Sequence, residues 1–193
     1  MLGGIFLTSN VLLFPRLGAV QTVILPILGQ ILMGTLIDTF GFFGAQQISF
    51  TKMRFLGILI TLVGVFVAVV FPSLNKKRAL EKPKHLFLWR IWAIIVGGLS
   101  AIQQAINGHL GVLLHHPAQA AFASFFIGFL AILVVSMVVD HRILKISELK
   151  KAKVWNGLGG MLGGLFVLAA VLAVPKIGAG LTIMMGLIGQ IFG

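Results

Sequence analysis

The chain lacks cysteine and has very few acidic side chains. None of its 193 residues is cysteine, which excludes a disulfide framework and a cysteine-ligated metal site. Only four residues are Asp or Glu, and charged residues of both signs make up 10% of the sequence. Soluble domains carry about a quarter charged residues. With 59% hydrophobic residues and a mean hydropathy of +1.09, the sequence predicts a polytopic membrane protein.

The scarcity of carboxylates also limits the chemistry that the chain can perform. The four acidic residues are expected at span ends or in loops, namely Asp38, Asp140, Glu81 and Glu148. No carboxylate is therefore expected in the middle of a span, where proton-coupled exporters of cations usually have one. No nucleophile–base pair is recognisable, and the adjacent His115 and His116 lack an evident third metal ligand. The sequence thus predicts no enzyme, no cofactor and no metal site.

Basic residues outnumber acidic ones and give a net charge of +11. They lie in short gaps between apolar runs, as in membrane proteins, so a nucleic-acid partner is not expected. On one side of the predicted topology lie twelve basic residues, in the loops 74–90 and 141–153 and at Arg16. On the other side lie three, which are Lys52, Arg54 and Lys176. The positive-inside rule then predicts that the loops 74–90 and 141–153 are cytoplasmic.

The two ends of the chain repeat one another. Residues 1–33 and 161–193 align without a gap at an offset of 160, with 14 identities in 33 positions. The identities include polar and backbone-special residues, in the pairs Pro15/Pro175, Gly18/Gly178, Thr22/Thr182, Gly29/Gly189 and Gln30/Gln190. Such spacing indicates a duplicated structural unit. In a membrane protein, duplicated halves are typical of secondary transporters.

Six apolar runs approach the length of about 20 residues that a membrane span requires. They are Leu17–Ile37, Phe55–Ser73, Ile91–Leu114, Pro117–Val139, Val154–Val174 and Ile177–Gly193. A seventh run, Met1–Phe14, is too short, and its repeat partner begins earlier, near Trp155. Parts of each copy have no counterpart in the other. The offset between the copies therefore predicts a fragment of a two-repeat protein of roughly 300 residues, truncated at both ends.

The number of spans between the two copies predicts their relative orientation. The second copy begins five spans after the first, and an odd number reverses its direction in the membrane. The expected fold is an all-α transmembrane bundle with inverted repeats of about five helices each. Residues 1–73 would be the last three helices of the first repeat, 74–87 a basic cytoplasmic linker, and 88–193 the first four helices of the second repeat.

Several motifs resemble a known family. They are the pattern LGG-x-F…VP-[RK]-x-GA-x-x-T…GQ, the stretch IDTFGFFG, and QQAINGHLGVLL…PAQAAFASFFIG. Together they resemble the YdcZ-type family of the drug/metabolite transporter superfamily over nearly the whole chain. The resemblance implies a transporter of the bacterial inner membrane, built from units of about five helices, either single or fused into ten.

The candidate substrate-binding residues are polar side chains within predicted spans. Gln30 and Gln190 lie mid-span in equivalent places, and an amide in hydrocarbon costs energy unless it is hydrogen-bonded. Two roles are open for them: they would line a shared midplane cavity, or they would hold the two halves together through an interhelical hydrogen bond. Thr22 and Thr182 lie two turns earlier, where bonding back to their own helix is favoured. The helix 91–114 adds Gln104 and Asn107 on a stripe of small and polar residues with Gly97, Ser100 and Gly111, for which helix packing is the commoner explanation.

Two functions are consistent with these patterns. The first is secondary transport of a small metabolite or drug-like molecule by alternating access. The alternative is a non-transporting or accessory membrane protein that only packs against a partner, against a second copy, or against the missing remainder of the full-length protein. The lipid bilayer is the surrounding partner in both cases.

Overall fold

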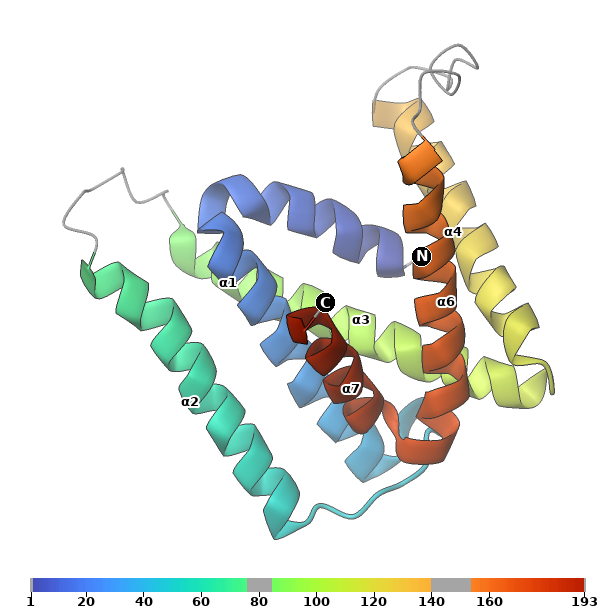
Figure 1. Cartoon of the computed structure of the whole chain (residues 1–193), viewed down its shortest axis with the longest axis horizontal. Helices are drawn as coiled ribbons and strands as arrows, with labels where there is room; N and C mark the ends of the chain where they lie inside the picture. The colour runs from blue at the N-terminus through green and yellow to red at the C-terminus, as the bar shows by residue number, and fades with distance from the viewer. Residues whose placement is uncertain (1, 76–84, 140–153, 193) are drawn as a thin grey trace.

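The computed structural model describes residues 2–75, 85–139 and 154–192, and in these ranges the chain is all-helical (Figure 1). The elements are α1 (Leu2–Phe40), the short 3-10 turn η1 (Phe42–Gly44), α2 (Lys52–Asn75), α3 (Leu86–Leu113), α4 (Pro117–Val139), α6 (Val154–Ile177) and α7 (Ala179–Phe192). The helical bundle confirms the fold class predicted from the sequence. The basic loops around 76–84 and 140–153 lie outside the described residues, so their predicted cytoplasmic side stays a prediction.

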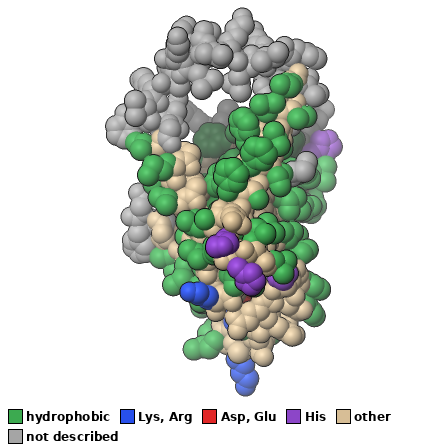
Figure 2. Space-filling model, turned by 90° about the vertical axis from the view of Figure 1, so that its right-hand side faces the viewer, with side chains coloured by type: hydrophobic (Ala, Val, Ile, Leu, Met, Phe, Trp, Pro, Cys, Tyr) green, Lys and Arg blue, Asp and Glu red, His purple; other side chains and the backbone are tan. Residues whose placement is uncertain are grey.

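Four of the described helical stretches are long and apolar enough to cross a membrane: Leu2–Phe40, Leu86–Leu113, Pro117–Val134 and Leu158–Ile177. Their outer faces carry exposed large hydrophobic side chains, among them Phe122, Phe126 and Leu162. Figure 2 shows one such face, covered over much of its area by hydrophobic side chains. Exposing this apolar surface to water would cost free energy, whereas exposing it to lipid would not. The surface therefore fits a protein embedded in a bilayer.

The helix α1 bends sharply at Gly18, where φ is 76° and ψ is 169°. A positive φ is easy for glycine and strained for other residues, which explains a helix break at this position. The two apolar runs predicted from the sequence, Met1–Phe14 and Leu17–Ile37, leave a gap at residues 15–16. In the structure Pro15 lies within the last turn of the first segment, and the glycine three residues later makes the turn.

The second copy of the repeat has the same local geometry. Its break is at Gly178, with φ of 85°, and Pro175 again lies within the preceding helix. In each copy the threonine four residues after the glycine donates to the glycine carbonyl, at 2.8 Å from Thr22 and 2.7 Å from Thr182. The side chain thereby binds a carbonyl at the start of the helix after the break. The repeat seen in the sequence is thus a repeated helix–glycine–helix unit.

The segments that follow the two breaks lie side by side in opposite directions (Figure 1). Near the end of α1, a β-carbon on Gly34 would come within 3.1 Å of the Cα of Gly180 at the start of α7. Further along, Ile31 shares a hydrophobic cluster with Ile183 and Leu187. Equivalent segments therefore run antiparallel, as inverted repeats require.

The helix α3 crosses the second segment of α1 at very short range. A β-carbon on Gly29 would overlap the carbonyl oxygen of Ile94, and one on Gly97 would overlap the carbonyl oxygen of Pro26. Small residues allow this approach, and in lipid such packing replaces the hydrophobic effect as the source of helix association. The predicted small stripe of α3 does face the bundle, since Gly97, Asn107 and Gly111 are buried.

The first turns of α3 also pack against the bend of α1. The Arg16 guanidinium lies 3.7 Å from the centre of the Trp89 ring, and Trp92 Nε1 donates to Ser9 Oγ at 3.2 Å. Arg90 Nε donates to Gln21 Oε1 at 3.0 Å. Arg16 therefore lies at the same end of the bundle as the start of α3, as the topology predicted, whereas Arg54 lies beside Asp38 near the other end of α1.

Candidate functional site

A cavity of about 620 Å³ lies between the two copies of the repeat. It is lined by both segments of α1, by α3, and by α6 and α7, through Phe6, Asn10, Val11, Phe14, Thr22, Val23, Pro26, Ile27, Gln30, Ser100, Gln104, Phe166 and Leu187. This volume lies within the range of sites for drug-sized ligands, roughly 300–1,000 Å³. Every helix that carries the repeat contributes to the wall.

The glycine break of α1 creates this arrangement. A straight helix could not present residues 6–14 and residues 22–30 to the same space, but the bend at Gly18 folds the first segment back toward the second. The close crossing at Gly29 and Gly97 then fixes α3 against α1. Together these contacts bring Gln104 of α3 opposite Gln30 of α1.

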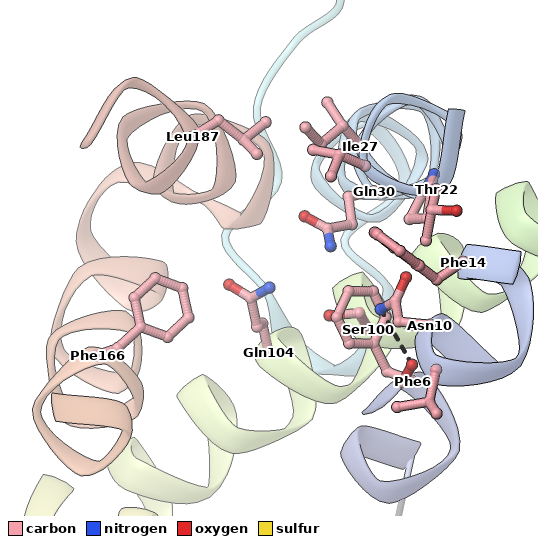
Figure 3. A pocket seen from close by; sticks show the side chains of 13 residues that line it. Phe6, Asn10, Phe14, Thr22, Ile27, Gln30, Ser100, Gln104, Phe166 and Leu187 are labelled. Atoms are coloured by element: carbon pink, nitrogen blue, oxygen red, sulfur yellow. Dashed lines mark hydrogen bonds between the residues drawn. The ribbon is translucent and has the colours of Figure 1, made fainter. Parts of the chain in front are cut away.

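Amide side chains project into the cavity from opposite walls. Figure 3 shows the amides of Gln30 and Gln104 pointing toward one another across the open space. The Oε1 atoms of Gln103 and Gln104 are both buried and have no hydrogen-bond donor among the described residues. The Asn10 amide instead donates to the carbonyl of Phe6 at 3.1 Å, one turn away. A buried acceptor without a donor is uncommon in folded proteins, and of these two oxygens only that of Gln104 belongs to a residue that lines the cavity.

The remaining wall is aromatic or aliphatic. The rings of Phe6, Phe14 and Phe166 surround the amides, with Ile27 and Leu187 between them (Figure 3). Among the described residues that line the cavity, none is ionisable. Such a site can bind an apolar molecule by contact and orient it through a small number of hydrogen bonds.

Only some of the six predicted substrate-binding residues lie in the wall of the cavity. Gln30, Gln104 and Thr22 line the cavity, the last with its hydroxyl bonded to its own helix. Asn107 is buried but donates to Ser124 Oγ of α4 at 3.0 Å, and Thr182 is buried and bonded to Gly178. Gln190 belongs to α7, and its side chain lies outside the described part of the chain. A substrate-binding role remains a prediction for all six.

Sequence reasoning did not predict Asn10 in the cavity wall or the buried contacts of Asp38. Asp38 lies near the end of α1, as predicted, yet its side chain is fully buried. Its Oδ1 accepts from the backbone N–H of Ala179 at 2.7 Å, and its Oδ2 from that of Gly180 at 3.0 Å. Arg54 of α2 lies 3.5 Å away, from Nη1 to Oδ2. The carboxylate therefore caps the start of α7, where free backbone donors and the helix dipole favour a negative charge.

The repeated glycine Gly178 is the one feature of the sequence that relates to the contact of Asp38 with the start of α7. A β-carbon at Gly178 would lie 2.8 Å from Asp38 Oδ2, so the glycine leaves room for the carboxylate as well as making the turn. Asp38 and Gly178 are nevertheless 140 positions apart. No local pattern relates them, because only the antiparallel packing of α1 on α7 brings them together.

Comparison with known proteins supports this architecture. A family model described as "Putative inner membrane exporter, YdcZ" matches residues 1–67 and 88–193, which is most of the chain. No curated protein and no solved structure matches the chain. The matched residues include the helices that surround the cavity and both copies of the repeat, and the chain therefore belongs to the YdcZ family, as an integral membrane protein of a transporter class.

Proposed function

We propose that the protein exports a small molecule across the bacterial inner membrane by alternating access, with the cavity between the two copies as its binding site. The single observation that carries this proposal is the composition of the wall, which takes residues from α1 of the first repeat and from α3, α6 and α7 of the second. Sites between inverted repeats are the usual place for substrate in secondary transporters.

The broken helices support the same proposal. In both copies a helix is interrupted by a glycine with positive φ, at Gly18 and at Gly178. Discontinuous helices frequently form the substrate sites of secondary transporters, and movement of one repeat against the other exposes the site alternately to each side. In the proposed cycle the segments before and after Gly18 change their relative angle while the cavity stays between them.

Each of the predicted residues has a proposed role. Gln30 and Gln104 would hydrogen-bond to the substrate, and Thr22 would line the wall beside them. Asn107 and Thr182 would position α3 and α7 through their bonds to Ser124 and Gly178. Gln190, the repeat partner of Gln30, would serve the equivalent place in the second copy.

Replacing Gln30 with leucine tests the cavity directly. The molecules released into the medium can be compared by untargeted mass spectrometry between cells that express the wild type, the variant or no protein. We expect a small molecule enriched by the wild type, and at least about a tenfold lower release with Gln30→Leu, because a hydrogen bond to the substrate is lost.

Gln103→Leu serves as the matched control. Gln103 lies next to Gln104 on α3 but does not line the cavity, and its amide is 3.5 Å from Ser124 Oγ. Export should survive this change, with membrane levels of both variants verified by immunoblot. Equal release from cells with and without the wild type would favour the accessory, non-transporting role. Unchanged release by Gln30→Leu would exclude the cavity as the transport site.

The proposed orientation can be tested with single cysteines, because the natural chain contains none. Lys52 begins α2, and Lys77 follows two residues after the end of that helix. With Lys52→Cys and Lys77→Cys, we expect a membrane-impermeant maleimide to label only the first in intact spheroplasts, and both after lysis. Labelling of both residues in intact spheroplasts would contradict the topology in which the basic loops are cytoplasmic.

A further inference from the structure

We infer that the cavity takes an uncharged amphipathic molecule with an aromatic or aliphatic body and at least one N–H or O–H donor. The inference rests on the proposed function and specifies the chemical class of its substrate. Three properties of the wall support it: its charge, its unpaired acceptor and its aromatic rings.

The charge of the wall disfavours ions. Among the described residues that line the cavity none is ionisable, and Asp38, the one acidic residue that the structure describes, is already bound to the start of α7 and to Arg54. Removing an ion from water is costly unless an opposite charge or several hydrogen bonds replace its hydration. Three phenylalanine rings could attract a cation through their faces, but such contacts offset only part of the cost of desolvation. An anion would find no cation among the described residues of the wall, whose hydrogen-bond donors are neutral amides and hydroxyls.

The unpaired acceptor requires a donor from the ligand. Gln104 Oε1 is buried without a donor among the described residues, and in Figure 3 it lies on the side of the amide toward Phe166, with the amide nitrogen toward Gln30. A turn of the Gln104 side chain would bring this oxygen to a ligand N–H or O–H, and the Gln30 amide across the open space could then bond the same polar group. A molecule without a donor would leave the oxygen unpaired, and an unpaired buried polar group weakens binding.

The rings define the body of the ligand. Phe6 and Phe14 come from the first segment of α1, and Phe166 faces them from α6. Aromatic pairs gain from stacked or edge-to-face arrangements, so a flat or apolar body would fit between these walls. The polar group would then lie between the two glutamines and the apolar body against the rings.

The experiment uses four probes with one naphthylpropyl body and different end groups. The end groups are a primary carboxamide, an N,N-dimethylcarboxamide without a donor, a trimethylammonium cation and a carboxylate anion. Binding is measured on the purified full chain in lipid nanodiscs, by displacement of the radiolabelled carboxamide. We expect the carboxamide to bind at least about tenfold more tightly than the other three probes.

Two variants of neighbouring residues make the test specific. Gln104→Glu places a carboxylate at the unpaired acceptor, and it should reverse the preference toward the trimethylammonium probe. Gln103→Glu introduces the same charge one residue away and outside the cavity wall, and it should leave the preference unchanged. A reversal in both variants would indicate a general effect of charge and would overturn the inference.

The outcomes separate this inference from the proposed function. If the cation or the anion binds most tightly to the wild type, and Gln104→Leu weakens that binding, the substrate class is wrong while the cavity remains the binding site. Equal binding of both carboxamides would overturn the requirement for a donor. If none of the four probes binds, the inference is overturned, and the release experiment with Gln30→Leu decides separately whether the cavity transports anything.

Discussion

Replacing Asp38 with alanine is expected to destabilise the protein by roughly 3–5 kcal/mol, the cost of breaking a buried charged network. The change leaves the backbone N–H groups of Ala179 and Gly180 without their acceptor in a buried place. It also leaves Arg54 without its carboxylate. Because Asp38 provides the hydrogen bonds and the ion pair between the end of α1 and its neighbours, α1 and α7 should separate at this end first. Thermal unfolding of the purified protein in nanodiscs measures the loss.

Two further variants identify which part of the network matters. Asp38→Asn keeps the shape and one acceptor oxygen, so it should retain part of the stability that Asp38→Ala loses. Arg54→Met removes the counter-ion and keeps both backbone hydrogen bonds. Its effect should be smaller, because the Arg54 side chain is 24% exposed and the ion pair is long. If Asp38→Ala unfolds at the temperature of the wild type, the carboxylate is not a structural contact.

Substituting leucine for Gly29 should prevent α3 from packing on α1. A β-carbon here would overlap the carbonyl oxygen of Ile94, a backbone atom that cannot rotate away as a side chain can. Overpacking in a core typically costs about 1–3 kcal/mol when side chains can adjust. We expect a larger loss here, since relief requires the two helices to move apart, with little folded protein recovered. Yield and monodispersity after size-exclusion chromatography are the measurements.

The repeat supplies the matched control for this substitution. Gly189 is equivalent to Gly29, but a β-carbon on it would have no neighbour within 4 Å in the described structure. Gly189→Leu should therefore be tolerated, although both glycines are followed by the same Gln–Ile pair. Equal losses from both variants would show that glycine is needed for the helix itself and not for the crossing with α3.

Several features of the protein were determined by the sequence alone. Hydropathy is a property of each segment by itself, so the membrane class and the approximate helices follow from it without knowledge of any tertiary contact. Pro117–Val139 was predicted with the bounds that α4 has. The duplication was equally accessible, because it depends only on the matching of residues such as Gly18 and Gly178. Helix ends were less accurate, since the glycine and not the preceding proline ends each helix.

The tertiary structure alone decided which polar groups meet. In a membrane both the lipid-facing and the protein-facing sides of a helix are apolar, so the pattern of hydrophobic residues specifies poorly how each helix is rotated. Gln104 and Asn107 lie one turn apart on one stripe, yet the first faces the cavity and the second bonds Ser124. Asp38 is charged and near a helix end, where the sequence gives no reason to expect burial. Contacts between backbones at Gly29, and between Asp38 and the start of α7, fix these orientations, because each joins residues that are far apart in the chain.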